Sequence, residues 1–128
     1  MLSDKENVLR FVWDTVRTTP ILDMHTHLFD TNFGDLLLWG IDELITYHYL
    51  VAETFRVAPM DYDAFWNMKK TAQADYIWKN LFVRRSPLSE ACRGVLTCIR
   101  ELGLDPAERD LKKIREYFAS ISVDDYID

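Results

Sequence analysis

A short apolar stretch that ends in two histidines, Ile21 to Leu28, limits most strongly what this chain can fold into. If the stretch is an extended strand, its side chains alternate between two faces, so His25 and His27 project to the same side. Asp23 shares that side. Leu22, Met24 and Leu28 face the opposite way and are expected to be buried against whatever covers the strand. Two imidazoles on one face can bind one metal ion. We therefore predict a metal site at the carboxyl end of this strand, where parallel sheets keep their functional groups.

The predicted strand has no partner in the sequence, because every other patterned segment reads as helix. A capping box of Ser3 and Glu6 starts the first helix, and the remaining predicted helices cover about 42–55, 61–68, 71–82, 86–102 and 105–118. Their predicted start signals include Asp61, Ser86-Pro87 and Asp105-Pro106, and Gly103 is a predicted stop. A lone strand leaves its backbone N–H and C=O groups unpaired. It either joins a sheet from another chain or from a continuation of this one, or becomes irregular and packs on helices. We favour a continuation, which predicts an N-terminal piece of a larger protein.

Composition excludes several classes of partner. The chain has 128 residues, of which 48% are hydrophobic, enough for one compact domain. Its 15 basic and 21 acidic residues give a net charge of −6, which opposes binding to nucleic acid or to an anionic membrane. No apolar run approaches the roughly 20 residues that span a bilayer, and the charged N-terminus does not read as a secretory signal. We expect a cytoplasmic protein with neither partner, and with Cys92 and Cys98 as reduced, buried thiols on different helix faces.

Each candidate site residue also has a structural explanation. The two strand histidines could be bonded to backbone carbonyls instead of a metal, although Asp23 is placed to hydrogen-bond and orient an imidazole. The third histidine, His48, lies between Tyr47 and Tyr49 in a predicted helix. His48 could hold a substrate oxygen and Tyr49 could act as a general acid or base, or all three rings could form an aromatic cluster. From the residues alone, the aromatic cluster is the preferred interpretation.

Other conspicuous residues are interpreted structurally. The aromatic rings of Trp66, Trp78 and Phe82 are expected to pack in the core rather than to stack on a sugar. Arg84 and Arg85 end a predicted helix, where a cation is favourable to the helix dipole. Carboxylate binding by these arginines is the less favoured alternative.

A family resemblance bears on these alternatives. The segment Leu22 to Leu28 resembles the first barrel strand of the metal-dependent amidohydrolase superfamily, and together with Tyr47-His48-Tyr49-Leu50 it resembles the uronate isomerase branch. The stretches 29–34, 38–42 and 84–94 strengthen the match. The resemblance implies a TIM barrel with a helical insertion after its first strand. We thus expect residues 1–128 to be one mainly α unit, with the first helix, barrel strand and metal-histidine loop in 1–34 and the helical insertion in 35–128.

The resemblance also implies an activity and residue roles. Members of this family interconvert hexuronates and their keto forms, such as glucuronate with fructuronate and galacturonate with tagaturonate. His25 and His27 would bind a divalent metal, expected to be zinc, with Asp23 supporting an imidazole. His48 would contact the hexuronate, and Tyr49 would transfer a proton. We expect a homo-oligomer.

The length of the chain limits what it can do alone. The family uses further residues from later barrel strands and loops, and 128 residues cannot close a barrel that takes about 200 or more. We therefore expect this chain by itself to be inactive. Two alternatives remain: a metal-dependent hydrolase that activates water, and a non-catalytic helical binding or assembly module.

Overall fold

The computed structural model describes residues 3–22, 24, 32–33 and 39–124, and these are mainly helical, as predicted. Its α-helices are α1 (Asp4–Thr18), α2 (Ile41–Ile45), α3 (His48–Val57), α4 (Tyr62–Trp66), α5 (Lys70–Trp78), α6 (Glu90–Glu101) and α7 (Lys112–Ser120). A π-helical turn, η2 (Lys79–Val83), continues α5. The described residues contain no β-strand.

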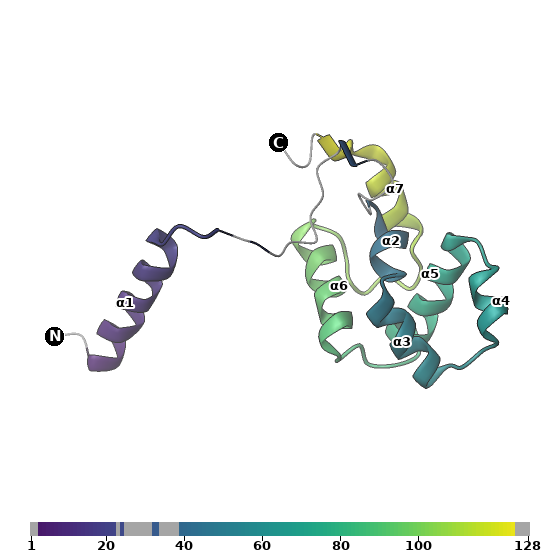
Figure 1. Cartoon of the computed structure of the whole chain (residues 1–128), viewed down its shortest axis with the longest axis horizontal. Helices are drawn as coiled ribbons and strands as arrows, with labels where there is room; N and C mark the ends of the chain where they lie inside the picture. The colour runs from purple at the N-terminus through teal and green to yellow at the C-terminus, as the bar shows by residue number, and fades with distance from the viewer. Residues whose placement is uncertain (1–2, 23, 25–31, 34–38, 125–128) are drawn as a thin grey trace.

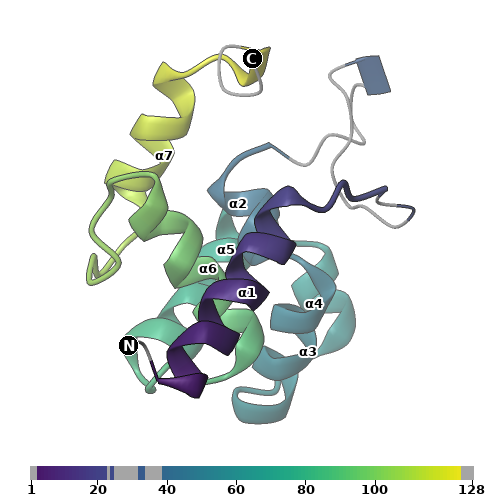
Figure 2. The ribbon, with the colours of Figure 1, turned by 90° about the vertical axis from the view of Figure 1, so that its left-hand side faces the viewer.

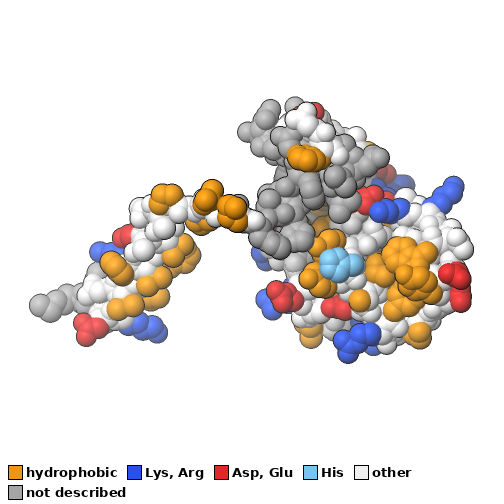
Figure 3. Space-filling view, viewed as in Figure 1, with side chains coloured by type: hydrophobic (Ala, Val, Ile, Leu, Met, Phe, Trp, Pro, Cys, Tyr) orange, Lys and Arg blue, Asp and Glu red, His pale blue; other side chains and the backbone are white. Residues whose placement is uncertain are grey.

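Helix α1 begins as predicted and projects away from the other helices (Figure 1). The Ser3 N–H donates to Glu6 Oε2 at 2.7 Å, and the Glu6 N–H donates to Ser3 Oγ at 3.3 Å, which completes the capping box. The helix buries no residue. Its apolar face, formed by Val8, Leu9, Phe11, Val12, Trp13 and Val16, is exposed, and apolar side chains are visible along it in Figure 3.

The predicted strand is wrong over the part of it that the structure describes. Ile21, Leu22 and Met24 are not in a strand, and their side chains are 84%, 85% and 86% exposed. No described strand lies beside them, so an extended conformation would gain no backbone hydrogen bonds from a neighbouring strand. Burial of Leu22 and Met24, which the strand pattern predicted, is therefore also wrong. The rest of the stretch, including both histidines, lies outside the described residues.

Helices α2 to α7 and η2 form one packed group. Helices α2 and α3 contact α5, α2 also contacts α7, and α3 also contacts η2 and α6. Figure 2, turned by 90°, shows α7 extending at one end of this group. The fully buried apolar side chains that hold it together are those of Ile41, Ile45, Phe65, Ala74, Ile77, Ile99, Leu111 and Ile114. Burying each large aliphatic side chain contributes about 1.5–3 kcal/mol to the free energy of folding, so this cluster explains why these helices stay packed together.

One helix expected over 42–55 is in fact two, and the break places the candidate residues. Thr46 Oγ1 donates to the Asp42 carbonyl at 2.7 Å, and Tyr47 is extended, with φ −61° and ψ 142°. Such a bond often bends a helix, and the extended backbone of Tyr47 ends this one. A new helix therefore starts at His48, and His48 and Tyr49 occupy its first turn.

Two other predicted starts are shifted along the chain. Helix α6 is capped by Ser89 rather than by Ser86-Pro87, because the Ser89 hydroxyl accepts from the Cys92 N–H at 3.2 Å. Helix α7 follows Leu111 rather than Asp105, whose carboxylate accepts from the Ala107 N–H in a tight turn. In both cases the predicted Ser-Pro or Asp-Pro pair lies in the loop just before the helix.

The predicted stop at Gly103 is confirmed. Gly103 has φ +74°, the left-handed conformation that glycine adopts without a Cβ penalty. Its N–H donates to the Arg100 carbonyl at 2.9 Å, and the Leu104 N–H donates to the Ile99 carbonyl at 3.0 Å. These two bonds form a Schellman motif that satisfies the last carbonyls of α6.

The aromatic and cysteine predictions have mixed outcomes. Trp78 is 2% exposed and stacks on Phe82, with ring centroids 4.4 Å apart, as expected. Trp66 is 47% exposed at the surface, so core packing is wrong for it. Cys92 is buried and Cys98 is exposed, which confirms that they lie on different faces but contradicts burial of Cys98.

Candidate functional site

The predicted metal ligands cannot be placed from this structure. His25, His27 and Asp23 lie outside the described residues, so their roles stay predictions. Within the described part of the chain, no group of three or more His, Cys, Asp or Glu side chains is arranged to hold a metal ion.

The rings of Tyr47, His48 and Tyr49 form a surface cluster at the start of α3. The His48 ring centroid lies 4.2 Å from that of Tyr47 and 4.1 Å from that of Tyr49, and the two tyrosine centroids are 5.6 Å apart. Both alternatives left open by the sequence are therefore compatible with this geometry, because the rings do pack on one another. They are not core residues, however: His48 is exposed and Tyr49 is 61% exposed. An exposed imidazole and phenol can reach a substrate.

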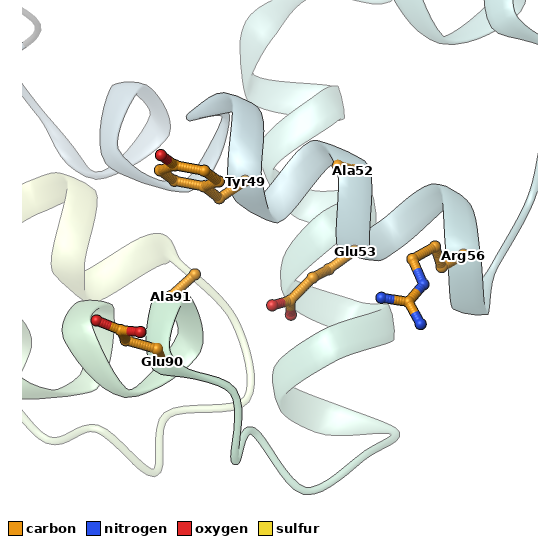
Figure 4. A pocket seen from close by; sticks show the side chains of 6 residues that line it. All are labelled: Tyr49, Ala52, Glu53, Arg56, Glu90 and Ala91. Carbon is orange, nitrogen blue, oxygen red and sulfur yellow. The ribbon is translucent and has the colours of Figure 1, made fainter.

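A groove between α3 and α6 begins beside Tyr49 (Figure 4). Its volume is about 600 Å³, and its lining residues are Tyr49, Ala52, Glu53, Arg56, Glu90 and Ala91. Four of these lie on α3 at spacings that share one helix face. The groove is thus lined by one phenol, two carboxylates and one guanidinium, so its acidic side chains outnumber its basic one.

Glu53 is the groove residue with the best defined contacts. Its Oε2 accepts a hydrogen bond from Ser89 Oγ at 2.8 Å and lies 3.6 Å from Cys92 Sγ. Burial raises the pKa of the Cys92 thiol above its usual range, the Ser89 hydroxyl opposes that shift, and the Glu53 carboxylate adds to it. Cys92 is therefore a neutral donor toward Glu53 near pH 7.

The opposite end of α3 is held by two side chains from later in the chain. Arg85 Nη2 donates to the Val57 carbonyl at 3.1 Å, and the Tyr76 hydroxyl donates to the Ala58 carbonyl at 2.9 Å. A cation at helix-terminal carbonyls is favourable, as was expected for Arg85. The helix end that it stabilises is that of α3, however, and not the end of its own segment.

Arg115 of α7 bonds side chains of two earlier helices, α2 and α5. Its Nε donates to Asp42 Oδ1 at 3.0 Å and its Nη2 donates to the same oxygen at 2.8 Å, which links α7 to α2. Nη2 also donates to Asp75 Oδ1 at 2.7 Å, which links α7 to α5. These contacts fix α2, and α2 leads directly into the first turn of α3.

The sequence indicates His48 and Tyr49 as candidate residues, but it does not indicate the side-chain contacts that join the surrounding helices. Ser89 carries a signal, because a serine before a helical apolar pattern is a common cap. Glu53 and Arg115 carry a weaker signal, because each is an ionisable side chain on a helix face that also contains core residues. Their partners lie 36 and 73 residues away in the chain, and local patterns do not specify such contacts.

A solved structure decides the family resemblance. The crystal structure of a uronate isomerase from Bacillus halodurans matches this chain with a TM-score of 0.85 and 54% sequence identity. The match covers 99% of this chain. The predicted resemblance to the uronate isomerase family is confirmed. This chain spans 30% of the length of that uronate isomerase.

Other comparisons add little to this result. No protein-family model matches the chain, and no curated protein matches it at a significant level. Among the described residues, no helix is both long and apolar enough to cross a membrane.

Proposed function

We propose that this chain forms part of a uronate isomerase that interconverts aldose and ketose forms of hexuronates, namely glucuronate with fructuronate and galacturonate with tagaturonate. The observation that carries the proposal is the 54% identity to a uronate isomerase over 99% of the chain, with a TM-score of 0.85. Because the match covers 30% of that protein, the remainder of the barrel would complete the site. The proposal includes a cytoplasmic homo-oligomer and an isolated chain without activity.

The proposed metal ligands are His25 and His27, with Asp23 orienting one imidazole. Their donor chemistry fits a divalent ion such as zinc, because two neutral imidazole nitrogens supply half of a tetrahedral set. When bound, such an ion would polarise the carbonyl and hydroxyl oxygens of the sugar. The remaining ligands would come from later in the barrel.

The proposed roles of the α3 residues follow from their exposure. His48 would hydrogen-bond a sugar oxygen, which fixes the substrate relative to the helix. Tyr49, 61% exposed at the edge of the groove, would hold or move the proton that passes between adjacent sugar positions. Its phenol can both donate and accept a hydrogen bond, as a proton-transfer group requires.

The test uses the full-length gene product that contains this chain, assayed with glucuronate and galacturonate. Tyr49→Phe removes one hydroxyl and should lower kcat by about 100-fold or more, the usual contribution of a general acid or base. Tyr62→Phe is the matched control, because Tyr62 is similarly exposed, at 64%, but lies on α4. Its kcat should equal that of the parent protein.

Separate variants test the metal ligands. His25→Ala and His27→Ala should each lose bound metal and turnover, whereas His48→Ala should keep the metal and raise KM. Unchanged turnover in both strand-histidine variants would contradict the ligand assignment. Hydrolysis of esters or amides without isomerisation would favour the hydrolase, and a metal-free protein without turnover would favour the binding module.

A further inference from the structure

We propose that Glu53 is a positioning residue, which sets the place of His48 and Tyr49 by fixing α3 to the start of α6. This inference rests on the proposed function for its catalytic consequence. Its structural part, that the Glu53 contact controls the first turn of α3, stands on the geometry alone.

The contact is directional and joins two helices that are distant in the sequence. Glu53 Oε2 accepts from Ser89 Oγ at 2.8 Å, and Ser89 Oγ in turn accepts from the Cys92 N–H at 3.2 Å. The α3 carboxylate is therefore bonded to the residue that caps α6. Figure 4 shows the Glu53 carboxylate directed from α3 into the space beside α6. A hydrogen bond to a carboxylate is stronger than one between neutral groups, which favours a single geometry.

Glu53 is well placed along the helix to act on the candidate residues. It follows Tyr49 by four residues and His48 by five, so it lies about 6 to 8 Å from them along the axis at 1.5 Å per residue. Tyr49 and Glu53 share a helix face, and both line the groove. A small change in the direction of α3 at Glu53 would therefore move both candidate side chains together.

Other contacts also restrain α3. Arg85 and Tyr76 bond the carbonyls of Val57 and Ala58 at the far end. Leu50, Val51 and Thr54 bury one face in the core, which resists rotation but provides no polar bond to α6. The first turn has no side-chain cap. The Glu53–Ser89 bond adds a polar side-chain contact between α3 and the start of α6, one helical turn from Tyr49.

The kinetic test compares Glu53→Ala with Glu53→Gln in the full-length gene product. Alanine removes the acceptor, and we expect kcat/KM to fall about tenfold or more, because a misplacement of reacting groups by about 1 Å can cost up to about 100-fold in rate. Glutamine keeps an oxygen that Ser89 can bond, so it should restore most of the loss. Glu101→Ala is the matched control: Glu101 also accepts a bond from a side chain, Arg100 Nη2 at 3.1 Å, but it lies at the last residue of α6. Its kcat/KM should not change.

A double-mutant cycle separates positioning from simple loss of stability. In a Tyr49→Phe background, Glu53→Ala should lower kcat/KM less than it does in the parent, because one of the two groups that it positions is gone. An equal loss in both backgrounds, or failure of Glu53→Gln to restore activity, would overturn the proposal.

A second measurement does not depend on activity. In the 128-residue chain, the rings of Tyr47 and Tyr49 lie about 4 Å from the His48 ring, so ring currents should shift its proton resonances, assigned by comparison with His48→Ala. Glu53→Ala should move these resonances, and Glu53→Gln should leave them in place. Unchanged resonances in Glu53→Ala would overturn the positioning role. If Glu53→Ala moves these resonances but the unsubstituted full-length protein does not isomerise uronates, the proposed function alone is refuted.

Discussion

Replacing Arg115 by methionine should destabilise the helical group by about 2 kcal/mol. Methionine keeps most of the aliphatic stem, so the loss reports the guanidinium contacts to Asp42 and Asp75. Hydrogen bonds to charged groups contribute about 1.5–3 kcal/mol, and an exposed ion pair contributes at most about 1. The Arg115 and Asp42 side chains are 29% and 21% exposed, whereas Asp75 is 56% exposed. The Asp42 contact should therefore supply most of the loss.

The Arg115 guanidinium contributes to stability at every pH at which its carboxylate partners are ionised. Hydrogen bonding to Asp42 raises the pKa of Arg115, a group that is already charged at neutral pH. The loss should be measured by urea and thermal unfolding of the 128-residue chain, followed by far-UV circular dichroism. For a domain of this size, about 2 kcal/mol corresponds to a fall in Tm of about 6–10 °C.

An exposed arginine provides the control for this measurement. Arg17 pairs with Asp14 at 3.0 Å on α1, and these side chains are 71% and 57% exposed. Arg17→Met should change stability by less than about 0.5 kcal/mol, since solvent screens such pairs. Equal effects of Arg115→Met and Arg17→Met would refute the reasoning that the burial of the Asp42 pair makes it stabilising.

Two further predictions concern α6. Gly103→Ala should destabilise the chain by about 1–2 kcal/mol, because Gly103 has φ +74°, where a Cβ is unfavourable. Gly94→Ala should stabilise the chain by up to about 1 kcal/mol, because Gly94 lies inside α6 and the added Cβ meets open space. Urea midpoints of the two variants that move in the same direction would contradict this reasoning. Because the pKa of Cys92 is raised, the folded chain holds the thiol proton longer than the unfolded chain, so this group's contribution to stability is lost as pH rises above the usual thiol pKa. Iodoacetamide should therefore modify exposed Cys98 well before Cys92, and equal rates at pH 8 would count against it.

Local signals in the sequence specify several helix ends. The capping box at Ser3 and Glu6, the cap at Asp61 and the stop at Gly103 are all observed, because each depends on residues within a few positions. Tyr47-His48-Tyr49 was also identified from the sequence as a candidate group. Its exposure follows from the break after Thr46, and the continuous apolar pattern over 42–55 gives no sign of that break.

Contacts between distant segments could not be read from the sequence. The bond from Ser89 to Glu53 and the bonds from Arg115 to Asp42 depend on how α6 and α7 pack against the earlier helices. The strand pattern of Ile21 to Leu28 failed where it can be checked, because pattern alone does not supply a neighbouring strand. The metal histidines remain a prediction from motif and family.

The central claim is that the protein containing this chain isomerises hexuronates, and the direct measurement is carbon-13 NMR of glucuronate incubated with the purified full-length gene product. We predict that the aldose signals decline and that a ketone carbon signal of fructuronate appears. The same sample with the His25→Ala variant should show no ketose. Persistence of the aldose alone, with galacturonate also unchanged, would contradict the account.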